Sequence, residues 1–230
     1  PTTLKDVIGQ THLIGNDQIL SNLVKNKKIF SMILYGPPGI GKTSIANAMI
    51  NDLGLRYRFL NATINSKHDL DVVIEEAKMY GDIILVMDEI HRLNKDKQDI
   101  LLPQLESGII TLIGMTTSNP FHAINPAIRS RCQLFELKQL ETDDIIKGLK
   151  KALNHPDLEG IKCEDKVIEL IAKLSGNDLR YAYNLLEIAY YSTDDKIITE
   201  EKVKKINSKP VFFSDKNGEG HYDVLSGLQK

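Results

Sequence analysis

The residues with the clearest chemical meaning are eight consecutive ones, "GPPGIGKT", from Gly36 to Thr43. They match the spacing G-x-x-x-x-G-K-[ST], between an apolar stretch that ends at Tyr35 and a helical pattern that begins near Lys42. In this setting the backbone amides of the loop surround an anion, the lysine reaches the β- and γ-phosphates of a nucleotide, and the threonine hydroxyl binds Mg²⁺. The segment predicts a loop that binds nucleotide phosphates.

A plain glycine-proline turn is the simpler alternative for this segment. Such a turn would need neither Lys42 nor Thr43, so the phosphate interpretation is preferred. The nucleotide-binding residues that we expect from the loop are Gly36, Pro37, Pro38, Gly39, Ile40, Gly41, Lys42, Thr43 and Ser44.

A second chemical signal is "ILVMDEI", in which an apolar strand ends in the adjacent carboxylates Asp88 and Glu89. Ionised groups are costly to hold near a core unless a cation or solvent meets them. In a protein with a phosphate loop, such an aspartate holds Mg²⁺ and the neighbouring glutamate orients and deprotonates the attacking water. Taken alone, the pair would be read as carboxylates facing water. Together with the phosphate loop, it predicts hydrolysis of a nucleotide.

Two other nucleotide-dependent classes are disfavoured. The stretch "NKDK", from Asn94 to Lys97, resembles the guanine-reading N-K-x-D but has a lysine where an aspartate must accept hydrogen bonds from the base. A GTPase is therefore not expected. A small-molecule kinase would share the phosphate loop, but it would require neither the carboxylate pair nor the arginines of "PAIRSRC".

The arginine in "SRC", Arg131, comes just before an apolar stretch that ends at Leu137. In an open parallel sheet the ligand lies at the carboxyl ends of the strands, whereas Arg131 precedes its strand. A strand of five or six residues spans about 17 to 20 Å, which exceeds the reach of an arginine. We therefore expect Arg131 to contact the γ-phosphate of a neighbouring subunit in a head-to-tail assembly. A surface ion pair is the alternative.

The elements that must position these residues alternate along the first 140 residues. Near-continuous apolar strands separated by helices predict an α/β fold with a parallel five-stranded sheet flanked by helices. After Leu137 the strand signal stops and only helices are expected. The predicted strands are Ser31–Tyr35, Tyr57–Asn61, Ile83–Met87, Thr111–Thr117 and Gln133–Leu137, and the later helices are Thr142–Leu153, Glu164–Leu174, Asp178–Tyr191 and Thr199–Ile206.

Composition sets wider bounds on the class of protein. The 230 residues include 42% hydrophobic and 26% charged ones, with 29 Lys and Arg against 31 Asp and Glu, so no global basic field exists for nucleic acid. The two cysteines, Cys132 and Cys163, lack metal-ligand spacing and suggest a reducing compartment. We expect a cytoplasmic protein without membrane contact. The first residue, Pro1, and the last stretch suggest a fragment of a longer chain.

Seven motifs in one order carry a resemblance to a known family. They are "VIGQ" (Val7–Gln10), "GPPGIGKT", "LNAT" (Leu60–Thr63), "MDEIHR" (Met87–Arg92), "TTSNP" (Thr116–Pro120), "SRC" (Ser130–Cys132) and "GNDLRYAYNLLE" (Gly176–Glu187). This chain resembles the AAA+ ATPases of the clamp-loader clade over nearly its whole length. Within that clade, the run from Asp88 to Pro120 is similar to the replication-associated recombination branch, the bacterial relatives of the Werner-interacting protein.

The resemblance implies further site residues, each with a simpler alternative. By this resemblance, Val7 and Ile8 contact adenine, and Asn61 is the polar partner that restrains Glu89 until DNA is sensed. Thr117 is the sensor-1 hydroxyl near the attacking water. Arg131 is the arginine finger, and Arg180 is the sensor-2 arginine of the same subunit. Asn61 could instead cap a helix, Thr117 could end its strand, and Arg180 could be solvated. The sequence departs from the family at Leu179, in "GNDLR" where GDAR is usual, and in the extra charge of Arg129.

The resemblance also implies domains, a function and partners. It divides the chain into an AAA+ nucleotide-binding domain (1–139), a small all-helical lid (140–207) and the start of a truncated C-terminal oligomerisation domain (208–230). The implied function is Mg²⁺-dependent, DNA-stimulated ATP hydrolysis in replication-fork maintenance, recombination and repair. Expected partners are further copies of the chain, as a tetramer for the full-length protein, DNA junctions and forks, single-strand-binding protein and the replisome. A nucleotide-switched scaffold or a branch-migration motor subunit is the alternative.

Overall fold

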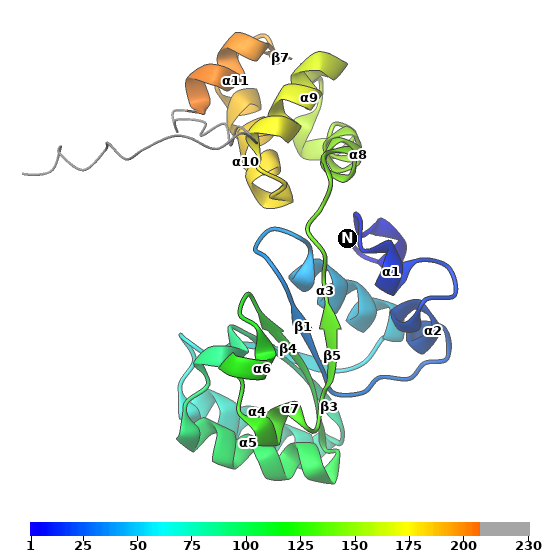
Figure 1. The fold of residues 1–230 in the computed structure, drawn as a ribbon, viewed down its shortest axis with the longest axis vertical. Coiled ribbons are helices and arrows are strands. Elements are labelled where there is room, and N and C mark those ends of the chain that lie inside the picture. The colour runs from blue at the N-terminus through cyan, green and yellow to red at the C-terminus, as the bar shows by residue number, and fades with distance from the viewer. Residues whose placement is uncertain (208–230) are drawn as a thin grey trace, which may run out of the picture.

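The structure, a computed structural model, describes residues 1–207 of the chain. The predicted C-terminal domain, 208–230, lies outside the described residues. Within them, an α/β domain is followed by a mostly helical lid, and Figure 1 shows the lid above the carboxyl edge of the sheet. Within residues 1–207, no helix combines the length and apolar character that crossing a membrane requires.

The central sheet has five parallel strands in the order β2-β3-β4-β1-β5, as the alternation of apolar stretches and helices predicted. All five predicted strands are confirmed, with ends that differ by no more than one residue. Their bounds are β1 Met32–Tyr35, β2 Tyr57–Asn61, β3 Ile83–Asp88, β4 Ile110–Thr116 and β5 Gln133–Glu136. Because the strands are parallel, their carboxyl ends meet at one edge.

Helices cover both faces of the sheet, which explains why its strands are apolar at successive positions. In β3, for example, Ile84 and Val86 face one buried cluster, and Ile83, Leu85 and Met87 face the other. The first cluster includes residues of α1 Thr11–Ile14, α2 Ile19–Lys25 and α3 Lys42–Leu53, and the second includes residues of α4 Lys67–Tyr80, α5 Lys95–Ser107 and α7 Pro126–Arg129. Short helices η1 Leu4–Asp6, η2 Ile90–Arg92 and α6 Pro120–Ala123 complete the domain.

The lid contains the four helices that the sequence predicted. They are α8 Thr142–Ala152, α9 Asp165–Leu174, α10 Leu179–Tyr191 and α11 Glu200–Ile206, joined in part by η3 Pro156–Leu158. The expectation of an all-helical lid was wrong in one detail. Two strands of two residues, β6 Lys162–Cys163 and β7 Ile197–Ile198, pair in parallel and are too short to give a strand pattern in the sequence.

A buried glutamine fastens the N-terminal segment to both the phosphate loop and the chain that enters the lid. The Gln10 amide donates to the carbonyls of Ile40 at 3.2 Å and Lys138 at 2.7 Å, and its oxygen accepts from the Lys138 N–H at 2.9 Å. Gln10 is 5% exposed, so water does not replace these bonds easily. The side chain therefore joins three segments that lie far apart in the sequence.

We expect Gln10→Ala to lower the free energy of unfolding by roughly 1–3 kcal/mol, because it removes the side-chain partner of a buried carbonyl at Ile40 and of two part-buried backbone groups at Lys138. Urea denaturation would measure the difference. Gln18→Ala, at an exposed position with no side-chain capping bond, is the control. Equal stability of the two variants would contradict the role given to Gln10.

Candidate nucleotide site

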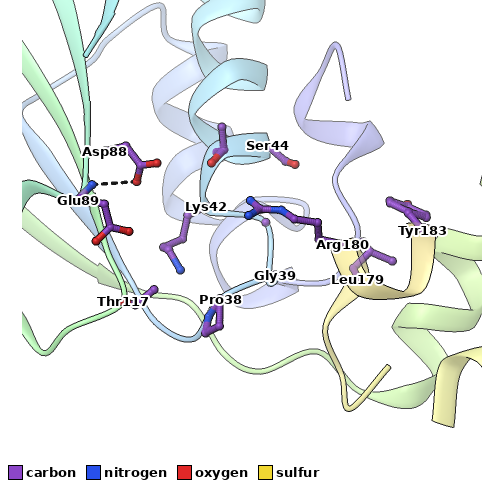
Figure 2. A pocket seen from close by; sticks show the side chains of 12 residues that line it. Pro38, Gly39, Lys42, Ser44, Asp88, Glu89, Thr117, Leu179, Arg180 and Tyr183 are labelled. Carbon is purple, nitrogen blue, oxygen red and sulfur yellow. Dashed lines mark hydrogen bonds between the residues drawn. The ribbon is translucent and has the colours of Figure 1, made fainter. Parts of the chain in front are cut away.

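The carboxyl edge of the sheet and the start of α10 enclose a cavity of about 270 Å³. Figure 2 shows Asp88 and Glu89 on one side of it, the lid residues Leu179, Arg180 and Tyr183 on the other, and Lys42 between them. The lining comprises Pro38, Gly39, Gly41, Lys42, Thr43, Ser44, Asp88, Glu89, Thr117, Leu179, Arg180 and Tyr183. Most of the predicted phosphate, metal and catalytic residues therefore share one cavity.

The phosphate loop leads from β1 directly into α3. Gly41, with φ of 103°, stands immediately before the first helical residue, Lys42, in a conformation that favours glycine. The Lys42 ammonium donates to the carbonyls of Gly36 at 2.7 Å and Pro37 at 2.6 Å. Of the predicted loop residues, Gly36, Pro37 and Ile40 do not line the cavity, and Ile40 is buried in the core.

Burial lowers the pKa of Lys42, while the nearby carboxylates of Asp88 and Glu89 oppose that change. Desolvation disfavours the charged ammonium, whereas negative charges favour it. The cavity thus holds a cation and two anions at the N-terminus of α3, where positive helix-dipole charge also favours an anionic ligand.

The two strand-end carboxylates are held in different ways. Asp88 ends β3 and accepts a hydrogen bond from the Glu89 N–H at 2.9 Å. Glu89 has φ of 51°, a left-handed conformation that is uncommon for a residue with a side chain. The turn that follows carries its carboxylate to the cavity, and its side chain is 37% exposed. The pair therefore offers one oxygen ligand fixed at the strand end and one carboxylate open to solvent.

The lid touches the phosphate loop through its backbone. The Leu179 N–H donates to the Gly39 carbonyl at 3.2 Å, and Asp178 caps α10 by accepting from the Tyr181 N–H at 3.0 Å. A β-carbon at position 39 would overlap the Asp178 carboxylate. The departure from the family at Leu179 thus falls on a residue that holds the loop by its N–H and lines the cavity.

A second cavity of about 710 Å³ adjoins the first, and both are lined by Gly41, Ser44, Leu179 and Tyr183. Its apolar lining includes Val7 and Ile8, the residues expected beside adenine, together with Leu158, Leu179 and Leu186. Apolar walls beside a charged cavity suit a ligand with a flat base at one end and phosphates at the other.

Asn61, the expected partner of Glu89, ends β2 and pairs in register with Asp88 of β3. Its side chain accepts from the Thr63 N–H at 2.9 Å, and the residue lines a separate small cavity with Lys97. No hydrogen bond or ion pair joins Asn61 to Glu89 within residues 1–207. An Asx turn of this kind uses the side chain locally.

Arg131 is absent from the lining of both cavities. Its guanidinium pairs with Glu106 and donates to the Ala127 carbonyl at 2.7 Å. The ion pair given as the alternative is therefore present. Arg129 has a local structural contact: it donates to the Phe121 carbonyl at 2.6 Å and lies over the Phe121 ring.

Two sets of polar contacts near the site have no signal in the sequence. The motifs contained His91, Thr116 and Gln10, but no signal showed that Thr116 bonds His91 at 2.9 Å or that Gln10 joins the loop to the lid. The stretch "NKDK" starts α5, where Asn94 accepts from the Lys97 N–H at 3.1 Å. That local bond gives the asparagine a helix-capping role.

The cysteines and several surface lysines outside the cavity have ordinary structural environments. Burial raises the pKa of the Cys132 thiol to about 12 and that of Cys163 to about 11, so neither is a ready thiolate. Several clustered lysines pair with carboxylates, as Lys151 does with Asp6 at 2.7 Å and Lys205 with Glu201 at 2.8 Å. These pairs mark solvated faces of the helices.

Two family models match this chain. The first, "ATPase family associated with various cellular activities (AAA)", matches residues 32–140, which hold the whole sheet and the phosphate loop. The second, "AAA C-terminal domain", matches residues 157–230.

Several curated proteins are similar to this chain over its whole length. "Replication-associated recombination protein A" of Bacillus subtilis is 49% identical over all of this chain and 57% of the relative, and its Escherichia coli counterpart is 33% identical over all of this chain and 54% of the relative. "ATPase WRNIP1" of Dictyostelium discoideum is 33% identical over 29% of its own length. This chain thus spans a little over half of the two bacterial relatives.

Among solved structures, the Thermotoga maritima RuvB Holliday junction branch migration motor superposes with a TM-score of 0.75. It is 25% identical, and the match covers 89% of this chain and 70% of that one. The sheet and the helical domain that follows it therefore share the fold of that motor.

Replacing the loop lysine tests the phosphate assignment. Lys42→Ala should lose most ATP affinity, because the loop keeps its amides but loses its charged phosphate ligand. A fluorescent ATP analogue titrated into the variant would measure this. Lys67→Ala, at an exposed lysine at the start of α4, should bind as the wild type does. If Lys42→Ala bound the ATP analogue as tightly as the wild type does, the assignment of Lys42 as a phosphate ligand would be contradicted.

Proposed function

Because this chain belongs to the AAA ATPase family, as a homologue of replication-associated recombination protein A, we propose that it hydrolyses ATP with Mg²⁺ and couples hydrolysis to DNA at replication forks. One observation carries the site assignment. A single cavity is lined by charged residues from three separate segments in two domains, namely Lys42, the Asp88–Glu89 pair and Arg180. A phosphate-binding site with a hydrolytic carboxylate needs that combination of charges.

The residues present fit a magnesium ion. Thr43 and Asp88 both line the cavity with oxygen atoms, the ligands that Mg²⁺ prefers, and Mg²⁺ commonly takes few protein ligands beside phosphates and water. Within residues 1–207, no cluster of three or more His, Cys, Asp or Glu side chains forms an all-protein metal site. When bound, the ion would neutralise charge on the β- and γ-phosphates.

The protein's own groups then have distinct tasks. Lys42 would release the carbonyls of Gly36 and Pro37 and turn to the phosphates of ATP. Glu89 would orient a water and accept its proton as oxygen attacks the γ-phosphorus. Thr117, exposed on the cavity wall, would hold that water, and Arg180 would bring positive charge from the lid to the γ-phosphate.

The proposed biological role comes from the relatives. We infer that the full-length protein assembles with further copies of itself, as a tetramer, and acts on DNA junctions and forks with single-strand-binding protein and the replisome. A domain from 208 onward would support assembly. A second candidate, a branch-migration motor subunit, is favoured by the superposition on the RuvB motor. A nucleotide-switched scaffold is the third, and its hydrolysis would only reset binding.

ATP turnover with and without DNA tests this proposal directly. We expect gapped or forked DNA to raise the turnover of full-length protein, while Glu89→Gln binds ATP normally and hydrolyses it about 10² to 10⁴ times more slowly, because an amide accepts no proton. Phosphate release would be measured on both proteins. A wild-type rate for Glu89→Gln would contradict the assignment of the base, and turnover indifferent to all DNA would favour the scaffold.

Arg131 is proposed to act in trans on the nucleotide of a neighbouring subunit. Its distance from the cavity of its own subunit follows from its position before β5, at the opposite edge of the sheet. The pair with Glu106 keeps the guanidinium near the surface, with 34% of the side chain exposed. A finger in trans and a surface ion pair predict different results when subunits are mixed.

Arg131→Ala should bind ATP almost normally but lose hydrolysis by about 10³-fold or more, as for other arginine fingers. Mixing it with Lys42→Ala subunits, which retain Arg131, should restore part of the activity under assembling conditions. Arg129→Ala is the matched control, since that arginine contacts Phe121 of its own chain. If the variants are folded and mixing them restores no ATP hydrolysis, Arg131 acts within its own chain or has only a structural role.

A further inference from the structure

Glu89 has a side-chain partner that the motifs did not indicate. Within residues 1–207, His91 is the residue whose side chain lies within ion-pair distance of the Glu89 carboxylate, with 3.4 Å between Nε2 and Oε2. The contact arises because Glu89 adopts a left-handed conformation and the chain then turns through η2. This geometry places the His91 imidazole next to the carboxylate of Glu89, two residues before it in the sequence.

The other ring nitrogen of His91 is fixed by the neighbouring strand. His91 Nδ1 lies 2.9 Å from the hydroxyl of Thr116, the last residue of β4. Thr116 is 1% exposed, and the His91 side chain is 13% exposed. Because both groups are largely removed from water, each polar atom needs a partner within the protein.

The contact with the Glu89 carboxylate favours one form of the neutral imidazole, and Thr116 can accommodate that form. The Thr116 oxygen accepts from the Ser118 N–H at 3.0 Å and retains its own proton, which it can donate to His91 Nδ1 in that form of the ring. In that form the proton of the ring is on Nε2, the nitrogen that lies 3.4 Å from Glu89 Oε2. The opposite form would place a bare nitrogen lone pair against a carboxylate, which is unfavourable.

We propose that His91 is a positioning residue for Glu89, in the tautomer that Thr116 can accommodate. By donating to one carboxylate oxygen, His91 would hold the group in one orientation and leave the second oxygen for the proton of the attacking water. This inference rests on the proposed role of Glu89 as the base. The spacing of 3.4 Å suits a contact that shortens when substrate closes the site.

The same contacts connect the base to the two other walls of the cavity. The Thr116 carbonyl accepts from the N–H of Gly36, the first residue of the phosphate loop, at 3.3 Å. The residue after Thr116 is Thr117, which lines the cavity. Hydrogen bonds thus run from the phosphate loop through the end of β4 to His91, which lies at ion-pair distance from Glu89, and all these residues belong to one subunit.

A double-mutant cycle in the full-length protein tests this inference. We expect His91→Ala to lower kcat by about ten- to a hundredfold with ATP affinity and KM nearly unchanged, because a poorly placed base slows chemistry and not binding. In a Glu89→Gln background the same change should cost little more, since His91 acts through Glu89. His68→Ala, at an exposed histidine of α4, should keep the wild-type rate.

Two further variants separate positioning from packing. His91→Gln keeps an N–H to donate to Glu89 and an oxygen to accept from Thr116, so it should recover part of the lost rate. Thr116→Val keeps the shape of the threonine but removes its hydroxyl, so it should lower kcat while circular dichroism stays unchanged. These variants keep the test decisive if His91→Ala does not fold.

The outcomes separate this inference from the proposed function. The positioning role alone would be overturned if His91→Ala and His91→Gln had the wild-type kcat or a higher one. It would also be overturned if the losses of His91→Ala and Glu89→Gln multiplied in the double variant. A Glu89→Gln protein that hydrolyses ATP at the wild-type rate would overturn the proposed function and this inference with it. A loss of kcat that disappears in the Glu89→Gln background supports both.

Discussion

Parallel pairing of the strands is the constraint on which the rest of the molecule depends. It buries both faces of the central strands β1, β3 and β4, so charged groups are excluded from their interiors and gather where these strands stop. Gly36 follows β1, Asp88 ends β3 and Thr116 ends β4, all at the same edge. The concentration of chemistry in one cavity is therefore a result of topology, before any individual contact is considered.

The lid completes a site that the sheet alone would leave open. Arg180 and Tyr183 of α10 face Lys42, Asp88 and Glu89 across the cavity, as Figure 2 shows. Two polar connections hold this arrangement: the Leu179 N–H on the phosphate loop, and Gln10 between that loop and Lys138 at the entrance to the lid. Both use backbone groups of the loop, so they leave its lysine and threonine side chains for the ligand.

Patterns that repeat along the chain could be predicted from the sequence, whereas contacts between distant residues could not. The five strands, four lid helices and phosphate loop each have a local signal of several residues. The bonds of Gln10 with Ile40 and Lys138, and of Thr116 with His91, depend on tertiary placement. Asn61 lies in register with Asp88 and forms a local Asx turn with Thr63, so its role toward Glu89 stays a prediction.

The close approach of Gly39 to Asp178 has a mechanical consequence. At Gly39 the phosphate loop contributes no side chain, so the Asp178 carboxylate packs against the loop backbone and the Leu179 N–H is bonded directly to the Gly39 carbonyl. Side chains between two elements can change rotamer and absorb a small displacement, but two backbones in contact cannot. A shift of the loop by a fraction of an ångström would therefore displace the start of α10 as well. The far end of the lid would then move further than the phosphate loop itself.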